Sequence, residues 1–121
     1  MAGILVFEDN LFAQQEIQRT LARDGHEVFG GFITSLDQAD GAIARAVLAG
    51  VTIAIVDRKL IGGDENDGIK IVEKLKNERI KSISYATNSK GMGADIDVGK
   101  ENSRQALLNG VAQALNIFVR E

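Results

Sequence analysis

Short apolar runs alternate along this chain with longer segments in which apolar residues recur about every three to four positions. The clearest run, residues 51–56, is largely β-branched and almost wholly apolar, as expected for a strand covered on both faces. Such alternation is typical of β-α-β units, in which successive strands run parallel. The pattern therefore predicts an α/β domain with a doubly wound parallel sheet.

The apolar runs predict five strands, over residues 4–7, 26–32, 51–56, 82–87 and 95–98. The segments of helical period predict helices over residues 11–23, 35–49 and 69–76, and a final helix that begins at Asn102 or Ser103. Ser35 is expected to cap the second helix. The apolar faces expected on the first, second and final helices comprise Leu11, Ile17, Leu21 and Ala22; Leu36, Ala39, Ile43 and Val47; and Leu107, Val111, Leu115 and Phe118.

The connection between the last two predicted strands is too short for the helix that a regular fold of this kind would have there. It spans only residues 88–94 and contains Gly91 and Gly93, whereas a crossover that includes a helix takes roughly 10–12 residues. An extended chain of this length can still return along the sheet. We therefore expect a parallel fifth strand with the fourth helix shortened or absent.

The composition limits which kinds of reactive or binding site the chain can form. The chain has 121 residues, 45% of them hydrophobic, and a net charge of −3, which predicts one domain over residues 1–121. It contains no Cys and one His, so thiolate chemistry, disulfides and histidine metal clusters are excluded. There is no basic run to bind nucleic acid directly and no apolar segment of membrane-spanning length, so a cytoplasmic location is expected.

Polar residues follow the predicted strands at the edge where open parallel sheets bind ligands. Glu8 and Asp9 follow the first strand, Asp57 follows the third, Thr87 ends the fourth and Lys100 follows the fifth. This set suits phosphoryl transfer to a carboxylate, with Asp57 as the nucleophile. Mg²⁺ held by Asp9 and Asp57, with Glu8 acting through water, would offset the repulsion between anions. Thr87 and Lys100 would bind the remaining phosphoryl oxygens.

At this point the chain resembles the receiver domain of two-component response regulators. The resemblance rests on four motifs in the family's order, namely Ile4-Leu5-Val6-Phe7-Glu8-Asp9-Asn10, Ile53-Ala54-Ile55-Val56-Asp57, Tyr85-Ala86-Thr87, and Gly93-Ala94 followed by Lys100. It extends over nearly the whole chain and implies a flavodoxin-like, five-stranded fold. It also implies a phosphoacceptor switch rather than an enzyme, apart from its own phosphorylation and dephosphorylation.

The resemblance further implies partners and residue roles. The phosphodonor would be a histidine kinase or a histidine phosphotransfer protein, the reader would be a downstream effector protein, and a homodimer is compatible with the family. By position, Asp57 resembles the phosphoacceptor, Glu8 and Asp9 the metal-binding pair, Thr87 the switch hydroxyl and Lys100 the invariant lysine, and the main-chain carbonyl of Lys59 matches the remaining ligand of Mg²⁺.

Four departures from the family concern the segment after the fourth strand. Lys100 follows Thr87 by only 13 positions and is followed by Glu101, where receivers usually have proline. Asp97 replaces the family's switch aromatic, and Asn88 stands where a small residue is usual. We therefore expect phosphorylation with an unusual readout.

Other interpretations stay open. Acids at strand ends often cap the next helix, Thr87 could be an ordinary strand residue, and Lys100 could be a solvated lysine. A pseudo-receiver that binds proteins without phosphorylation is the main alternative function. An aspartyl phosphohydrolase is disfavoured because Lys59 stands where that chemistry needs a second acid.

Overall fold

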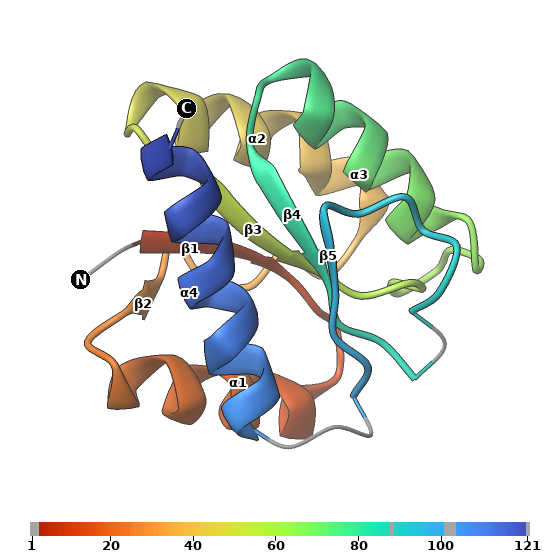
Figure 1. The fold of residues 1–121 in the computed structure, drawn as a ribbon. Helices are drawn as coiled ribbons and strands as arrows, with labels where there is room; N and C mark the ends of the chain where they lie inside the picture. The colour runs from red at the N-terminus through yellow and green to blue at the C-terminus, as the bar shows by residue number, and fades with distance from the viewer. Residues whose placement is uncertain (1–2, 88, 101–103, 121) are drawn as a thin grey trace.

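The computed structural model describes residues 3–87, 89–100 and 104–120, the last four through their backbone (Figure 1). Its centre is a sheet of five strands, β1 (Gly3–Phe7), β2 (Glu27–Val28), β3 (Ile53–Val56), β4 (Lys81–Ser84) and β5 (Ile96–Asp97). The strands lie in the order β2-β1-β3-β4-β5, and each neighbouring pair is parallel. The predicted α/β sheet is thus confirmed, although every strand after the first is shorter than the apolar run that predicted it.

Helices cover both faces of the sheet (Figure 1). One side has α1 (Leu11–Arg23) and α4 (Arg104–Arg120), and the other has α2 (Ala39–Leu48), preceded by a 3₁₀ turn (Leu36–Gln38), and α3 (Asp67–Asn77). Each side encloses its own cluster of buried apolar side chains, because alternate residues of a strand point to opposite faces. In β1, Leu5 and Phe7 belong to the α2–α3 side, and Ile4 and Val6 belong to the α1–α4 side.

Some of the predicted helix faces and caps are wrong. Leu11 and Ala22 are exposed, since six positions from Ile17 turn Leu11 about 120° from the buried stripe. Val47 is 44% exposed at the edge of α2. Ser35 makes no side-chain cap hydrogen bond.

Three residues of the predicted final helix cannot be compared in full. Asn102 and Ser103, the predicted cap, lie outside the described residues, as does the side chain of Phe118. Within the described part of that helix, Leu107 and Val111 are buried, as predicted. The apolar face of α4 therefore packs on the sheet.

The connection between β4 and β5 contains no helix in its described parts, residues 85–87 and 89–95, as the sequence predicts. Met92 fixes this segment to the α2–α3 side, where it is 2% exposed. Beyond it, Asp95 Oδ2 accepts a hydrogen bond of 2.9 Å from Ser82 N at the start of β4. A buried methionine and a carboxylate thus hold the connection where a helix would otherwise cover the sheet.

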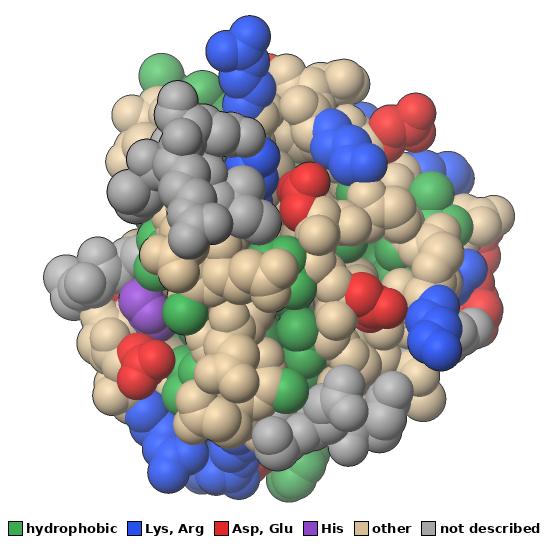
Figure 2. Space-filling model, viewed as in Figure 1, with side chains coloured by type: hydrophobic (Ala, Val, Ile, Leu, Met, Phe, Trp, Pro, Cys, Tyr) green, Lys and Arg blue, Asp and Glu red, His purple; other side chains and the backbone are tan. Residues whose placement is uncertain are grey.

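Two observations describe the molecular surface. No helix in the described part of the chain combines the length and apolar character that crossing a membrane requires. Among the described side chains on the face shown in Figure 2, basic and acidic groups are interspersed and form no continuous basic surface. Such a surface is what binding to a phosphate backbone needs.

We predict that Gly68→Ala destabilises the fold. A Cβ atom at this position in α3 would lie 2.5 Å from the main-chain oxygen of Asp57, 2.5 Å from Met92 Cε and 2.8 Å from Arg58 Cα. Because two of these atoms are backbone, the packing has to shift, which should lower the free energy of unfolding by about 1–3 kcal/mol. Denaturant titration measures this change.

Gly41→Ala is the matched control, because Gly41 also lies in a helix, and its Cβ would meet only the flexible end of Arg45, at 3.3 Å. Alanine in a helix interior is favoured over glycine by roughly 0.5–1 kcal/mol. Equal effects of the two substitutions would show that the close packing at Gly68 does not limit stability.

Candidate functional site

The pairing of β1 with β3 brings two acids to one edge of the sheet. Phe7 is in register with Val56, so Glu8 and Asp57, the next residues of each chain segment, leave the sheet side by side. A hydrogen bond of 2.9 Å from Asp57 N to the oxygen of Phe7 continues the ladder to this point. The register therefore places the two carboxylates together as a consequence of strand pairing.

Asp9 joins them to form a cluster of three acids. One carboxylate oxygen from each of Glu8, Asp9 and Asp57 lies within 4.8 Å of the others. Glu8 Oε1 is buried and receives no hydrogen bond from the described residues beyond its ion pair with Lys100. Hard divalent cations such as Mg²⁺ prefer oxygen ligands of this kind. The donor set therefore fits Mg²⁺.

Lys100 completes the cluster from the other side. Its main chain is fixed by a hydrogen bond of 3.1 Å from Lys100 N to the oxygen of Ala86, just beyond β4. Its ammonium nitrogen lies 2.7 Å from Glu8 Oε1 and 3.2 Å from Asp57 Oδ2. Lys100 thus lies opposite the acids, although few positions separate it from Thr87 along the sequence. The interpretation of Lys100 as a solvated lysine is therefore wrong.

The electrostatics of the cluster are dominated by the burial of Glu8, which is 1% exposed. Burial raises the pKa of Glu8 to about 7, assisted by the charge of Asp57 and opposed by the hydrogen bond and charge of Lys100. Burial lowers the pKa of Lys100, but its contacts with Glu8 and Asp57 outweigh this and raise that pKa overall. The lysine therefore stays charged at neutral pH.

Thr87 and Lys59 lie around the same opening. Together with Asp57 and Lys100 they line a depression of about 580 Å³ at the carboxyl edge of the sheet. Thr87 follows β4 rather than belonging to it and is exposed, so it is not a strand residue. The role of the Lys59 carbonyl as a metal ligand stays a prediction.

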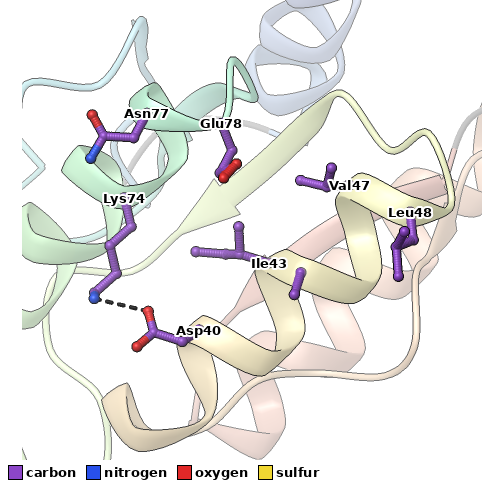
Figure 3. Close-up of a pocket in the computed structure, with 8 residues that line it drawn as sticks. Asp40, Ile43, Val47, Leu48, Lys74, Asn77 and Glu78 are labelled. Atoms are coloured by element: carbon purple, nitrogen blue, oxygen red, sulfur yellow. Dashed lines mark hydrogen bonds and ion pairs between the residues drawn. The ribbon is translucent and has the colours of Figure 1, made fainter.

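A second depression, of about 540 Å³, lies between α2 and α3 (Figure 3). An ion pair of 2.9 Å between Lys74 and Asp40 joins the two helices there, and Val47 and Leu48 form an apolar flank. None of the candidate residues from the strand ends lines it. This depression is therefore separate from the candidate residues at the carboxyl edge of the sheet.

Two contributors to the site escaped prediction from the sequence. Asn10, not Glu8 or Asp9, caps α1, because its side chain accepts a hydrogen bond of 2.9 Å from Ala13 N. An asparagine directly before a segment of helical periodicity is a recognised N-cap signal, so the sequence could have predicted this cap. Arg58 N donates a hydrogen bond of 2.8 Å to Asp57 Oδ1. That contact depends on the path of the loop and has no sequence signal.

Of the residues at which the chain departs from the receiver pattern, the structure describes Asp97. Asp97, in place of the family's aromatic, is exposed, and its Oδ1 accepts a hydrogen bond of 3.0 Å from the hydroxyl of Ser84. Asn88 and Glu101 lie outside the described residues. At position 97 the structure therefore has a fixed carboxylate instead of a ring that could rotate.

The raised pKa of Glu8 predicts a specific dependence of stability on pH. The folded protein holds this proton more firmly than the unfolded chain, so the contribution of Glu8 is complete below about pH 4.5 and is lost as pH rises through about 7. Between these limits Glu8→Gln should gain stability relative to the parent by up to roughly 3 kcal/mol. Unfolding titrations at pH 4.5 and pH 8 measure it, and a constant difference would contradict the raised pKa.

Comparisons with known proteins bear on the fold. No protein-family model and no curated protein matches the chain. Among solved structures, the CheY-like response regulator receiver domain protein of Methanospirillum hungatei JF-1 matches with a TM-score of 0.74 and 20% identity, over 96% of this chain and 94% of that one. The BeF3-activated N-terminal receiver domain of RstA from Klebsiella pneumoniae gives 0.76 and 20%, over 93% and 97%.

A response regulator receiver protein from Sinorhizobium medicae WSM419 is similar to the same degree, with a TM-score of 0.73 and 18% identity over 95% of this chain and 94% of that one. The sequences have diverged widely, yet the matches include nearly the full length on both sides. The chain therefore has the fold of response-regulator receiver domains, as its motifs predicted.

Proposed function

We propose that this protein is a phosphoacceptor signalling domain of a two-component system or phosphorelay, in which Asp57 receives the phosphoryl group. The observation that supports this best is the meeting of Glu8, Asp9 and Asp57 within 4.8 Å of one another, with Lys100 Nζ 3.2 Å from Asp57 Oδ2. A depression of about 580 Å³ opens beside Asp57 and Lys100. The receiver fold of the similar structures agrees with it.

In the proposed reaction, a carboxylate oxygen of Asp57 attacks the phosphorus of a phosphohistidine on a histidine kinase or phosphotransfer protein. An O–P bond forms as the N–P bond breaks, and the electron pair of the broken bond stays with the imidazole nitrogen. The product is an aspartyl phosphate. Small acyl phosphates would donate in the same way, with the leaving carboxylate oxygen keeping the pair.

The other residues stabilise charge during this transfer. The Lys100 ammonium and the Thr87 hydroxyl border the opening and would bind phosphoryl oxygens. Glu8, Asp9 and Asp57, with the Lys59 carbonyl, would hold Mg²⁺, which when bound neutralises the negative charge that the carboxylates and the donor bring together. Lys100, Thr87 and the bound Mg²⁺ would thus offset the repulsion between the carboxylate of Asp57 and the phosphoryl group of the donor.

The proposal describes a switch rather than an enzyme that turns over a separate substrate. An aspartyl phosphohydrolase needs a second acid two positions after its nucleophile, and Lys59 occupies that position. The partners would be a cytoplasmic kinase or phosphotransfer protein and a separate effector protein, without direct contact to nucleic acid. A change of surface on phosphorylation would alter effector binding.

Treatment with acetyl phosphate and Mg²⁺ should add the mass of one phosphoryl group to the parent protein, and Asp57→Asn should remain unmodified because an amide is not a nucleophile here. Intact-mass spectrometry measures both. Asp37→Asn, which changes an exposed acid before α2, is the control and should be modified like the parent. An unmodified parent under forcing concentrations of donor would refute the proposed function.

Asp9→Asn should weaken Mg²⁺ binding by about tenfold or more, because it removes one charged oxygen donor from the cluster. Titration calorimetry with Mg²⁺ alone measures the dissociation constant, and Asp37→Asn again serves as the control. Equal affinities of Asp9→Asn and the parent would show that the acids do not form the metal site.

A pseudo-receiver is the second candidate, favoured by the fixed Asp97 in place of the switch aromatic. Such a module would bind its partner equally with or without Mg²⁺ and beryllofluoride, which mimics a phosphoryl group. Stronger or weaker binding in the presence of beryllofluoride would exclude it.

A further inference from the structure

Arg58, the residue after the proposed phosphoacceptor, connects two loops that border the site. Its main-chain N–H donates to Asp57 Oδ1 at 2.8 Å, and its oxygen accepts a hydrogen bond of 2.8 Å from Gly68 N in α3. Its guanidinium Nη1 donates to the main-chain oxygen of Lys90 at 3.1 Å, and its Nε lies 3.7 Å from Glu65 Oε2. One residue thus contacts the site, α3 and the β4–β5 connection.

Within residues 89–95 of that connection, Ser89 and Met92 are buried and the turn between them is exposed. Met92 is buried in the α2–α3 cluster, and Asp95 is bonded to Ser82. Between β4 and Met92, the Arg58–Lys90 hydrogen bond joins the turn around Lys90 and Gly91 to the rest of the protein, and both of these residues are exposed. Loss of this bond would release the turn while Met92 stays anchored.

The position of Arg58 makes this bond sensitive to charge at Asp57. The side chains of both residues line the same depression, and the guanidinium now donates to a neutral carbonyl. A phosphoryl group on Asp57 would add close to one further negative charge and three strong acceptor oxygens there. Arginine binds phosphate oxygens in a bidentate manner and more strongly than it binds a neutral oxygen. Phosphorylation would therefore favour a guanidinium turned towards Asp57.

We propose that Arg58 is the switch residue of this protein: its guanidinium holds Lys90 when Asp57 is unmodified and leaves it for the phosphoryl group, so that residues 89–95 become the surface that reports phosphorylation. This inference rests on the proposed phosphorylation of Asp57. Movement of Arg58 would transmit phosphorylation to the protein surface without an aromatic switch residue. Position 97 has no ring, and its Asp97 carboxylate is held by Ser84. The contact between the guanidinium and the phosphoryl group exists only in the second arrangement, and it supplies the differential interaction that a two-state change requires.

The test is amide hydrogen exchange of residues 89–95 in the full chain, with Mg²⁺ and with or without acetyl phosphate throughout. In the parent, phosphorylation should accelerate exchange in this segment by about three- to tenfold, as expected when one partly exposed charge-assisted hydrogen bond is lost. In Arg58→Ala the segment should exchange at the fast rate already without donor, and the donor should change nothing. Intact mass is read in parallel, and samples are compared at equal phosphorylated fractions.

Lys90→Ala is the matched control, because the bond uses the main-chain oxygen of Lys90 and not its side chain. It should respond to the donor like the parent. A phosphorylated parent with unchanged exchange, or an Arg58→Ala protein that responds as the parent does, would overturn the switch and leave the phosphoacceptor function intact. A parent that gains no mass would overturn both.

Discussion

The feature on which the rest depends is the parallel pairing of β1 with β3, which forces acids at the ends of both strands into one small volume. Phe7 and Val56 are partners in the ladder, so Glu8 and Asp57 leave the sheet together. Like charges at this distance, one of them almost fully buried, repel unless a cation joins them. Lys100 supplies that cation within the chain, at 2.7 Å from Glu8 and 3.2 Å from Asp57.

This balance relates stability to function. A buried carboxylate whose pKa is raised to about 7 costs free energy when charged, which a site selected only for stability would avoid. The same cluster of acids offers oxygen donors that fit Mg²⁺, and Asp57 lies at an open depression. The unfavourable burial of an acid therefore occurs at the place where the proposed phosphoryl transfer needs preorganised charges.

In the described residues of the connection between β4 and β5, side chains rather than a helix hold the chain on the sheet. Met92 fills apolar space on the α2–α3 side, and Asp95 and Asp97 bind the strand residues Ser82 and Ser84. These contacts hold a two-residue edge strand in register. Asp97 is held at this position by the hydroxyl of Ser84, and in our proposal the response to phosphorylation travels through Arg58 instead.

The sequence by itself determined the order of strands and helices, the shortening or absence of a helix between the last two strands and the identity of the acids, because alternating apolar runs and strand-end polarity are local properties. The predicted burial of Leu11 and the predicted cap at Ser35 were wrong. The burial of Leu11 depends on how α1 is rotated against the sheet, and the cap at Ser35 depends on the conformation of the chain before the 3₁₀ turn. Only the tertiary structure decided that Lys100 meets Asp57, and that Arg58 reaches Lys90, since these contacts join residues 43 and 32 positions apart. Such contacts depend on how the loops fold over the sheet edge, which no local pattern encodes.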